Sequence, residues 1–111
     1  MGGTVSQGDV CRYTFKEPDK RRPVLILTRN SAIPVLTSLT VAPITTTIRS
    51  IPTEVRLSQA GGLFSDCAVN LDNIQTVQKT RIGAFITHLS PHHMRAVRKA
   101  IEFPLGFDAL Y

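Results

Sequence analysis

Residues 8–15 alternate between two sets of side chains, which is the period of a β-strand. One of the two sets is apolar and consists of Cys11, Tyr13 and Phe15. The pattern therefore predicts a strand that buries this face and leaves the other partly polar.

Residues 23–27 form an uninterrupted apolar run instead of an alternating one. Such a run is typical of a strand that is covered on both faces. Pro23 opens the run, and proline is tolerated as the first residue of a strand. The preceding residues, 16–22, are polar and rich in cations, so they are predicted to form a loop.

More strands are predicted downstream, because short segments rich in β-branched residues are separated by turn residues. These segments are Thr37–Thr46, Thr53–Leu57, Cys67–Leu71 and Ile74–Val77. Residues 58–66 contain Gly61 and Gly62 and are predicted to form a loop, and Asp72 and Asn73 mark a turn. Short strands without intervening helices indicate a small barrel.

The period changes near the end of the chain. Ser90 and Pro91 provide an N-cap hydroxyl and a proline suited to the first helical position. Met94, Val97 and Ile101 then recur at helical spacing until Pro104 and Gly106 end the pattern. The predicted fold class is mainly β with a C-terminal helix: an SH3-like antiparallel barrel of about five to seven strands, with residues 1–111 as a single domain.

The chain has 13 Lys and Arg residues against 8 Asp and Glu residues, a net charge of +5. This balance favours a polyanionic partner such as nucleic acid. Neither a secretory signal nor an apolar stretch long enough to span a membrane is visible, so we expect a cytoplasmic protein without membrane contact. Cys11 and Cys67 lack a CxxC spacing and are interpreted as buried small hydrophobic residues.

Arg22 is the first candidate for chemistry, because a guanidinium is always charged and can donate two hydrogen bonds to phosphate oxygens. An isolated arginine before a strand is usually only solvated. Here Lys16, Lys20 and Arg21 concentrate positive charge in the same loop, which favours a phosphate contact.

Thr45 and Asp72 are two further candidates. The hydroxyl of Thr45, at the end of a predicted strand, is suited to donate to a phosphoryl oxygen, although threonine is also a common strand residue. The carboxylate of Asp72 is suited to orient a group or accept a proton, and an Asp-Asn pair is equally common in ordinary turns.

Three histidines raise the question of a metal site. His88 and His92 are four residues apart, but Ser90 and Pro91 start the helix between them, so the two do not share a helical face. We interpret His88 as a residue preceding the helix, and His92 and His93 as exposed first-turn residues. No metal site and no cofactor are predicted.

Four motifs follow one another along the chain: Gly8-Asp9-Val10, Arg22-Pro23-Val24-Leu25-Ile26, Val41-Ala42-Pro43-Ile44-Thr45 and Cys67-Ala68-Val69-Asn70-Leu71-Asp72-Asn73-Ile74-Gln75-Thr76-Val77. In this order and spacing the chain resembles the MazF/PemK family of toxin endoribonucleases, from about Gly8 to Phe107. The resemblance implies a CcdB/MazF-like barrel with a terminal helix and a homodimer.

The resemblance also implies sequence-selective, metal-independent cleavage of single-stranded RNA, by a toxin that a cognate antitoxin protein neutralises. The 2′-hydroxyl of the RNA would attack the adjacent phosphate and leave a 2′,3′-cyclic phosphate and a 5′-hydroxyl. The family's usual catalytic arginine and threonine match Arg22 and Thr45, and an aspartate of PemK-like members matches Asp72. The expected RNA contacts are Lys16, Lys20, Arg21, Thr46, Asn70 and Gln75.

Two departures from the family pattern concern RNA preference. The segment between Phe15 and Arg22 is shorter than in many members and lacks their Gly-Ser-Glu-Gln stretch. Gln75 stands where members often have an arginine. Both differences point to a cleavage specificity of the chain's own.

Two other functions are compatible with a small basic barrel. One is a non-catalytic toxin that binds a protein target, as CcdB toxins do through carboxyl-terminal residues. The apolar end of this chain, Phe103 to Tyr111, gives that function little support. The other is an RNA-binding barrel that leaves its RNA intact, with an affinity that falls as salt rises.

Overall fold

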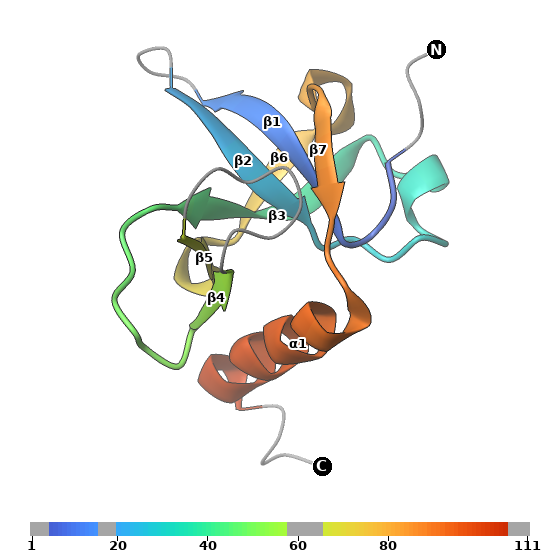
Figure 1. Cartoon of the computed structure of the whole chain (residues 1–111). Helices are drawn as coiled ribbons and strands as arrows, with labels where there is room; N and C mark the ends of the chain where they lie inside the picture. The colour runs from blue at the N-terminus through green and yellow to red at the C-terminus, as the bar shows by residue number, and fades with distance from the viewer. Residues whose placement is uncertain (1–4, 16–19, 58–65, 107–111) are drawn as a thin grey trace.

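The computed structural model describes residues 5–15, 20–57 and 66–106 (Figure 1). The strands in these residues are β1 (Asp9–Phe15), β2 (Lys20–Ile26), β3 (Ser38–Thr45), β4 (Glu54–Leu57), β5 (Cys67–Asn70), β6 (Gln75–Gln78) and β7 (Phe85–His88). Three 3-10 helices join some of the strands: η1 (Ile33–Val35), η2 (Leu71–Asn73) and η3 (Lys79–Arg81). The α-helix α1 (Pro91–Leu105) follows β7.

The sheet is organised around β3, which pairs with three other strands. The order is β4-β5-β3-β2-β1-β7, with β6 also paired to β3, and the pairs are antiparallel. β2 lies along one edge of β3, while β6 and then β5 take the other edge. This branching makes the sheet curl into a half-barrel (Figure 1).

The core is divided between the two faces of this sheet, because successive side chains of a strand point to opposite faces. The helix-side core consists of Val10, Leu25, Ala42, Ile44, Val55, Leu57, Cys67, Val69, Leu71, Leu89, Val97 and Ala100. The far-side core consists of Val24, Ile26, Ile33, Leu39, Val41 and Val77. β2 contributes to both cores, which confirms the prediction that its apolar run is covered on both faces.

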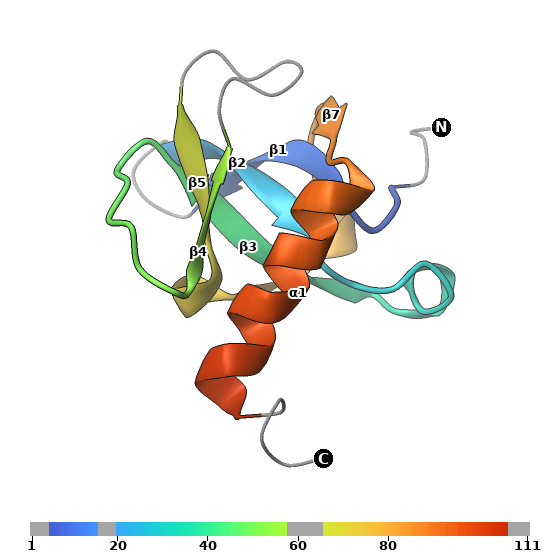
Figure 2. The same cartoon turned by 60° about the horizontal axis from the view of Figure 1, so that its bottom comes forward.

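Helix α1 packs across one face of the sheet and buries Val97 and Ala100 there (Figure 2). It begins as the sequence predicts, because the Ser90 hydroxyl accepts a hydrogen bond from the His93 backbone N–H at 3.3 Å. It ends at Gly106, whose φ of 72° is the left-handed conformation that glycine adopts without strain. No helix of the described residues is long and apolar enough to cross a membrane.

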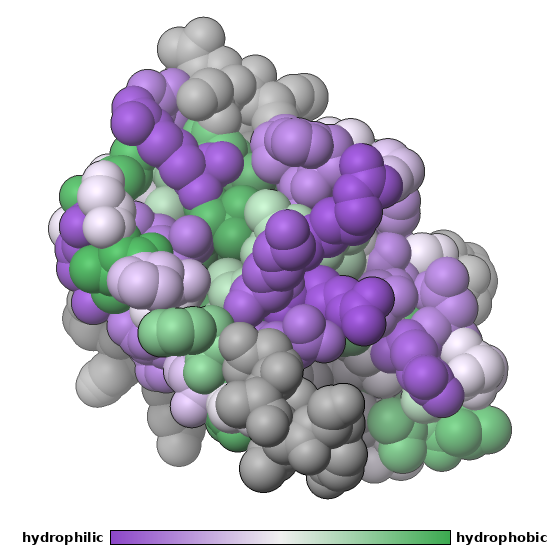
Figure 3. Space-filling model, turned by 90° about the horizontal axis from the view of Figure 1, so that it is seen from below, coloured by the Kyte–Doolittle hydropathy of each residue, from purple (hydrophilic) through white to green (hydrophobic). Residues whose placement is uncertain are grey.

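The outer face of α1 carries positive charge. Arg95, Arg98 and Lys99 are exposed, and Arg98 donates to Glu102 one helical turn later at 3.0 Å. Seen from the side of the helix, hydrophilic side chains form a band across the middle of this face, and apolar side chains lie beside it (Figure 3). The buried apolar residues of α1 face the sheet and its exposed charged residues face away from it, which explains the hydrophobic periodicity of the helix.

The fold class is confirmed, and the bounds of the strands β3 to β6 differ from the predicted ones by one residue at most. Three larger details differ from the sequence prediction. β2 begins at Lys20 and not at Pro23, because its pairing with β1 continues to Phe15 opposite Lys20. Arg21 and Arg22 therefore lie in a strand and not in a loop. The α-helix continues through Pro104 to Leu105.

The third difference is β7, which the sequence analysis did not predict. Phe85 is exposed and no residue of β7 is fully buried, so the strand lacks an apolar pattern. It exists because its backbone completes the edge of the sheet beside β1. His88 is consequently the last residue of a strand, where its Nδ1 lies 2.8 Å from Oδ1 of Asp9.

Candidate functional site

A cavity of about 370 Å³ lies where the ends of several strands meet. It is lined by Phe15, Arg22, Pro43, Thr45, Thr47, Arg49, Asn70, Asn73 and Gln75. β3 contributes two of these residues, and β1, β2, β5 and β6 contribute one each. The remainder come from the segment after β3 and from η2. Arg22 and Thr45, which are distant in the sequence, line the same space.

The pleat of the sheet explains why these residues meet. Arg22 lies two residues before Val24 in β2, and Gln75 lies two residues before Val77 in β6, so each shares a face with the far-side core. Thr45 lies four residues after Val41 in β3, an even number of residues, so its side chain is on that face as well. The cavity is therefore the polar continuation of the far-side core, at the end where the apolar residues stop.

Arg22 is half-buried and lies opposite Tyr13 in the ladder between β1 and β2. Among the described residues, no carboxylate lies within ion-pair distance of its guanidinium. A half-buried cation without an anionic neighbour favours the binding of an anion from solution.

Thr45 has a defined hydrogen-bond geometry. The backbone N–H of Thr47 donates to Oγ1 of Thr45 at 3.1 Å. Because this bond occupies the hydroxyl oxygen as an acceptor, the hydroxyl hydrogen is available to a ligand in the cavity. Thr45 can therefore act as a donor beside the positive charge of Arg22.

Asp72 lies at the rim and not in the lining of the cavity. Its Oδ2 accepts a hydrogen bond from the guanidinium of Arg49 at 3.1 Å, and its side chain is 41% exposed. Arg49, in contrast, lines the cavity. The structure thus connects Asp72 to the cavity through an arginine that the sequence analysis did not select.

The predicted RNA contacts are distributed unevenly. Asn70 and Gln75 line the cavity with Arg22 and Thr45. Arg21 and Thr46 are exposed and do not line it, because each is one residue away from a lining residue. Lys16 and the side chain of Lys20 lie outside the described residues.

Sequence reasoning missed five of the lining residues: Phe15, Pro43, Thr47, Arg49 and Asn73. Phe15, Pro43, Thr47 and Asn73 each lie within two residues of a predicted site residue, so proximity in sequence was a usable signal. Arg49 had no such signal, because its position depends on how the segment between β3 and β4 turns back. The described lining residues contain no carboxylate and no histidine.

A model of one protein family matches residues 6–104 of the chain. That family is described as the PemK-like, MazF-like toxin of the type II toxin-antitoxin system. The chain belongs to this family.

Curated relatives and solved structures similar to this chain are also MazF proteins. The endoribonuclease MazF3 of Mycobacterium tuberculosis is 46% identical over 90 residues, which cover 81% of this chain and 87% of the relative. A structure of the Mycobacterium tuberculosis toxin MazF-mt6 superimposes with a TM-score of 0.80 at 39% identity, covering 93% of this chain and 99% of the other.

A further structure contains a partner protein. It is a mycobacterial endoribonuclease in complex with its cognate antitoxin, with a TM-score of 0.81 and 28% identity. The match covers 92% of this chain and 95% of that toxin. The MazF-like fold of this chain is therefore also found in a toxin bound to its antitoxin.

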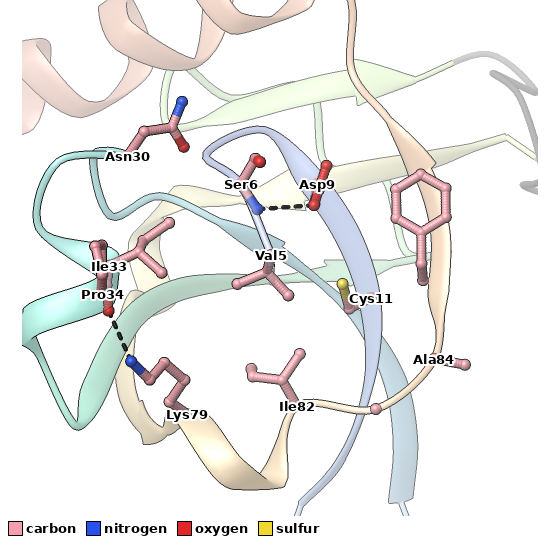
Figure 4. A pocket seen from close by; sticks show the side chains of 12 residues that line it. Val5, Ser6, Asp9, Cys11, Asn30, Ile33, Pro34, Lys79, Ile82 and Ala84 are labelled. Carbon is pink, nitrogen blue, oxygen red and sulfur yellow. Dashed lines mark hydrogen bonds between the residues drawn. The ribbon is translucent and has the colours of Figure 1, made fainter. Parts of the chain in front are cut away.

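A second and larger cavity, of about 680 Å³, lies on another part of the surface between β1, η1 and the segment before β7. Val5, Ile33 and Ile82 point into it (Figure 4). The amine of Lys79 is held at its edge by a 2.8 Å hydrogen bond to the carbonyl of Ile33. The lining also contains the carboxylate of Asp9, which would repel a phosphate, and its cation, Lys79, is already bonded, so this cavity is less suited to phosphate chemistry than the smaller one.

Cys11 also lines the larger cavity, and its thiol is buried. Burial, together with the negative charge of Asp9, raises the pKa of the Cys11 thiol from 9.0 to about 11. Burial likewise raises the pKa of Cys67, and Asp66 adds to this effect. Both cysteines are buried, which confirms the prediction, and neither forms a disulfide. The described residues contain no group of side chains arranged to hold a metal.

We expect the Cys11 thiol to react slowly with iodoacetamide in the folded protein at pH 8, because only the thiolate is nucleophilic. The folded pKa of about 11 exceeds 9.0, so this group should stabilise the fold fully below pH 9 and lose that contribution as the pH rises through 11. Unfolding curves at several pH values should therefore show a smaller loss of stability above pH 9 for Cys11→Ala than for the wild type. Rapid labelling of the native protein at pH 8 would contradict this account.

Proposed function

We propose that this chain is a sequence-selective endoribonuclease that cleaves single-stranded RNA, and that an antitoxin neutralises it as a toxin. The observation that carries the proposal is the cavity in which Arg22 and Thr45 lie together with Asn70 and Gln75. The relatives named as endoribonucleases support the reaction class. The net charge of +5 suits a polyanionic substrate.

The substrate supplies the nucleophile in the proposed reaction. The 2′-oxygen forms a bond to the neighbouring phosphorus, and the bond from phosphorus to the 5′-oxygen breaks with its electron pair on that oxygen. The products are a 2′,3′-cyclic phosphate and, after the 5′-oxygen takes up a proton, a 5′-hydroxyl. This course requires no protein nucleophile and no metal ion, which suits a cavity whose described lining contains neither a cysteine nor a histidine.

Arg22 and Thr45 stabilise the charge that builds on the phosphoryl oxygens as the 2′-oxygen attacks. Arg22 has no carboxylate neighbour among the described residues, so its charge is available to the phosphate. The Thr45 hydroxyl adds a neutral donor whose own oxygen is held by Thr47. Donors that are fixed before the reaction stabilise a transition state without having to reorganise.

Asp72, at the rim of the cavity, accepts the proton of the 2′-hydroxyl in this scheme, because the described lining itself offers neither a carboxylate nor an imidazole. Arg22 or water returns a proton to the leaving 5′-oxygen. A substitution of Asp72→Asn that leaves the cleavage rate unchanged would remove Asp72 from the path of the proton.

The other polar groups of the cavity are suited to hold an unpaired nucleotide. The amide side chains of Asn70 and Gln75 can donate to and accept from base edges, and the ring of Phe15 offers a surface on which a base can stack. These groups require bases that are not already paired, which is the reason for a single-stranded substrate.

Arg22→Ala and Thr45→Val should each lower the cleavage rate about a hundredfold or more, since each removes a donor to the transition state. Rates would be measured on a fluorescent RNA pool, with circular dichroism to verify folding. Arg12→Ala and Thr76→Val are matched controls, because both residues are exposed on strands of the same sheet and neither lines the cavity. Full activity of a folded Arg22→Ala variant would refute the assignment.

RNA in which the 2′-hydroxyl at the cleaved position is replaced by hydrogen should bind but stay intact, because the nucleophile is missing. Cleaved wild-type RNA should carry 2′,3′-cyclic phosphate and 5′-hydroxyl ends, which mass spectrometry distinguishes from 5′-phosphate ends. EDTA should leave the rate unchanged. The proposed chemistry would be contradicted if the protein cleaved the 2′-deoxy substrate. It would also be contradicted if EDTA inhibited the cleavage of unmodified RNA.

A homodimer and an antitoxin complete the proposal. The exposed side chains of Val35 (77%) and Phe85 (62%) provide apolar surface for a second copy. The antitoxin would cover the basic cavity with an acidic segment, as charge complementarity favours. Sedimentation of the purified protein at micromolar concentration should give the mass of a dimer, and a monomer mass at every concentration tested would exclude this assembly.

A further inference from the structure

Glu54 has a buried carboxylate that accepts hydrogen bonds from the backbone of one short segment, Arg49 and Ser50. Its side chain is only 2% exposed, and it begins β4 opposite Asn70. The two carboxylate oxygens accept the backbone N–H of Arg49 at 2.9 and 3.1 Å, and Oε1 also accepts the N–H of Ser50 at 2.8 Å. A buried charge is costly unless it is bonded, so these bonds link the segment firmly to the strand.

The same segment contains a strained residue. Ser50 has a φ of 55°, the one positive φ of a non-glycine residue in the part of the chain that the structure describes. A serine adopts this conformation only where surrounding contacts hold it there. The contacts here are the Glu54 hydrogen bonds to Arg49 and Ser50, and their effect is to turn the Arg49 side chain towards the cavity.

The guanidinium of Arg49 is oriented at its other end as well. One of its terminal nitrogens donates to Asp72 at 3.1 Å and lies 3.4 Å from the side-chain oxygen of Asn70. The side chain remains 44% exposed. Since a guanidinium has five N–H donors, these bonds leave donors that can reach a ligand in the cavity.

The two arginines of the cavity therefore differ electrostatically. Arg49 lies 3.8 Å from Glu54 and 3.1 Å from Asp72, whereas Arg22 has no carboxylate partner among the described residues. Because the charge of Arg49 is already partly compensated, Arg22 is the stronger stabiliser of new charge on the reacting phosphate. A neighbouring phosphate that does not react keeps the same charge in the ground state and the transition state, so an arginine that holds it binds both states similarly. Such uniform binding lowers Kd and KM and changes kcat little.

We propose that Arg49, positioned by Glu54, binds a phosphate of the RNA next to the one that is cleaved. This inference rests on the proposed function, and it deepens it by adding a second phosphate contact to the site. Arg22 then serves the reacting phosphate, and Arg49 sets the position of the strand by holding its neighbour. Glu54 is a positioning residue that acts through Arg49.

The test measures binding separately from cleavage. An RNA oligonucleotide with a single 2′-deoxy substitution at the cleaved position is titrated against the protein at several salt concentrations. Arg49→Gln should weaken binding about tenfold near 0.1 M salt and reduce the slope of log K against log salt by about 0.7 to 1. On cleavable RNA the same variant should raise KM. Because Arg49 also holds Asp72, the proposed proton acceptor, kcat is compared in an Asp72→Asn background, where Arg49→Gln should change it less than about threefold.

Arg56→Gln is the matched control. Arg56 lies in β4 and forms a comparable 3.1 Å ion pair with Asp66, but it does not line the cavity. This variant should leave Kd and the salt slope unchanged. Arg49→Lys keeps the charge, so it should keep the slope while losing part of the affinity.

A double substitution tests the role of Glu54. Glu54→Gln alone should weaken binding, and combined with Arg49→Gln it should weaken binding no further, because both changes remove the same contact. Additive losses would overturn the positioning role. An Arg49→Gln variant that unfolds more easily but binds with unchanged Kd and slope would show that Arg49 is only structural, and the proposal would fail.

Two further outcomes separate this inference from the proposed function. A changed cleavage sequence with an unchanged salt slope would mean that Arg49 contacts a base, and it would overturn the phosphate contact. Wild-type protein that binds RNA without cleaving it would overturn the enzymatic function, while the salt slope would still decide the role of Arg49. Wild-type protein that fails to bind the RNA would overturn both.

Discussion

The alternation of side chains along β2 and β3 is the constraint on which the rest of the structure depends. In both strands one set of residues enters the helix-side core and the other enters the far-side core, so both faces of the sheet exclude water. Arg22 and Thr45 belong to the same alternation as Val24 and Val41. The packing that stabilises the sheet therefore also fixes the direction of the side chains that line the site.

Because the site residues are mounted on strands that the core already holds, the site is rigid without further stabilising contacts. The backbone of β2 is paired with β1 at Arg22 and with β3 from Val24 onward, so the backbone at Arg22 is held by one strand and by the doubly paired residues that follow it. Thr45 is positioned equally well, because β3 is paired with β5 at this point. Groups mounted on paired strands keep their geometry better than groups on loops, which is what stabilisation of a short-lived charge requires.

Charge is distributed unevenly across the cavity, and buried hydrogen bonds maintain this distribution. The side chain of Glu54 is almost completely buried and its carboxylate is satisfied by backbone donors, so it does not compete with a phosphate for Arg22. Asp72 is bonded to Arg49 at the rim. The same acidic residues that would repel RNA if they faced the cavity instead hold a second cation in place. The membership of the MazF-like toxin family is consistent with such a cationic site.

The sequence by itself determined the fold class, the helix boundary at Ser90 and most of the strands, because hydrophobic period and capping residues act locally. It also selected Arg22 and Thr45, through motifs that resemble those of a known family. It did not determine β7, whose existence depends on a neighbouring strand edge, nor the start of β2 at Lys20, which depends on pairing with β1. Only the tertiary structure placed Arg49 in the cavity and bonded Asp72 to it, because these contacts join residues of β4, η2 and the segment after β3. Interactions between segments distant in sequence leave no period in the sequence, so their geometry appears only when the chain is folded.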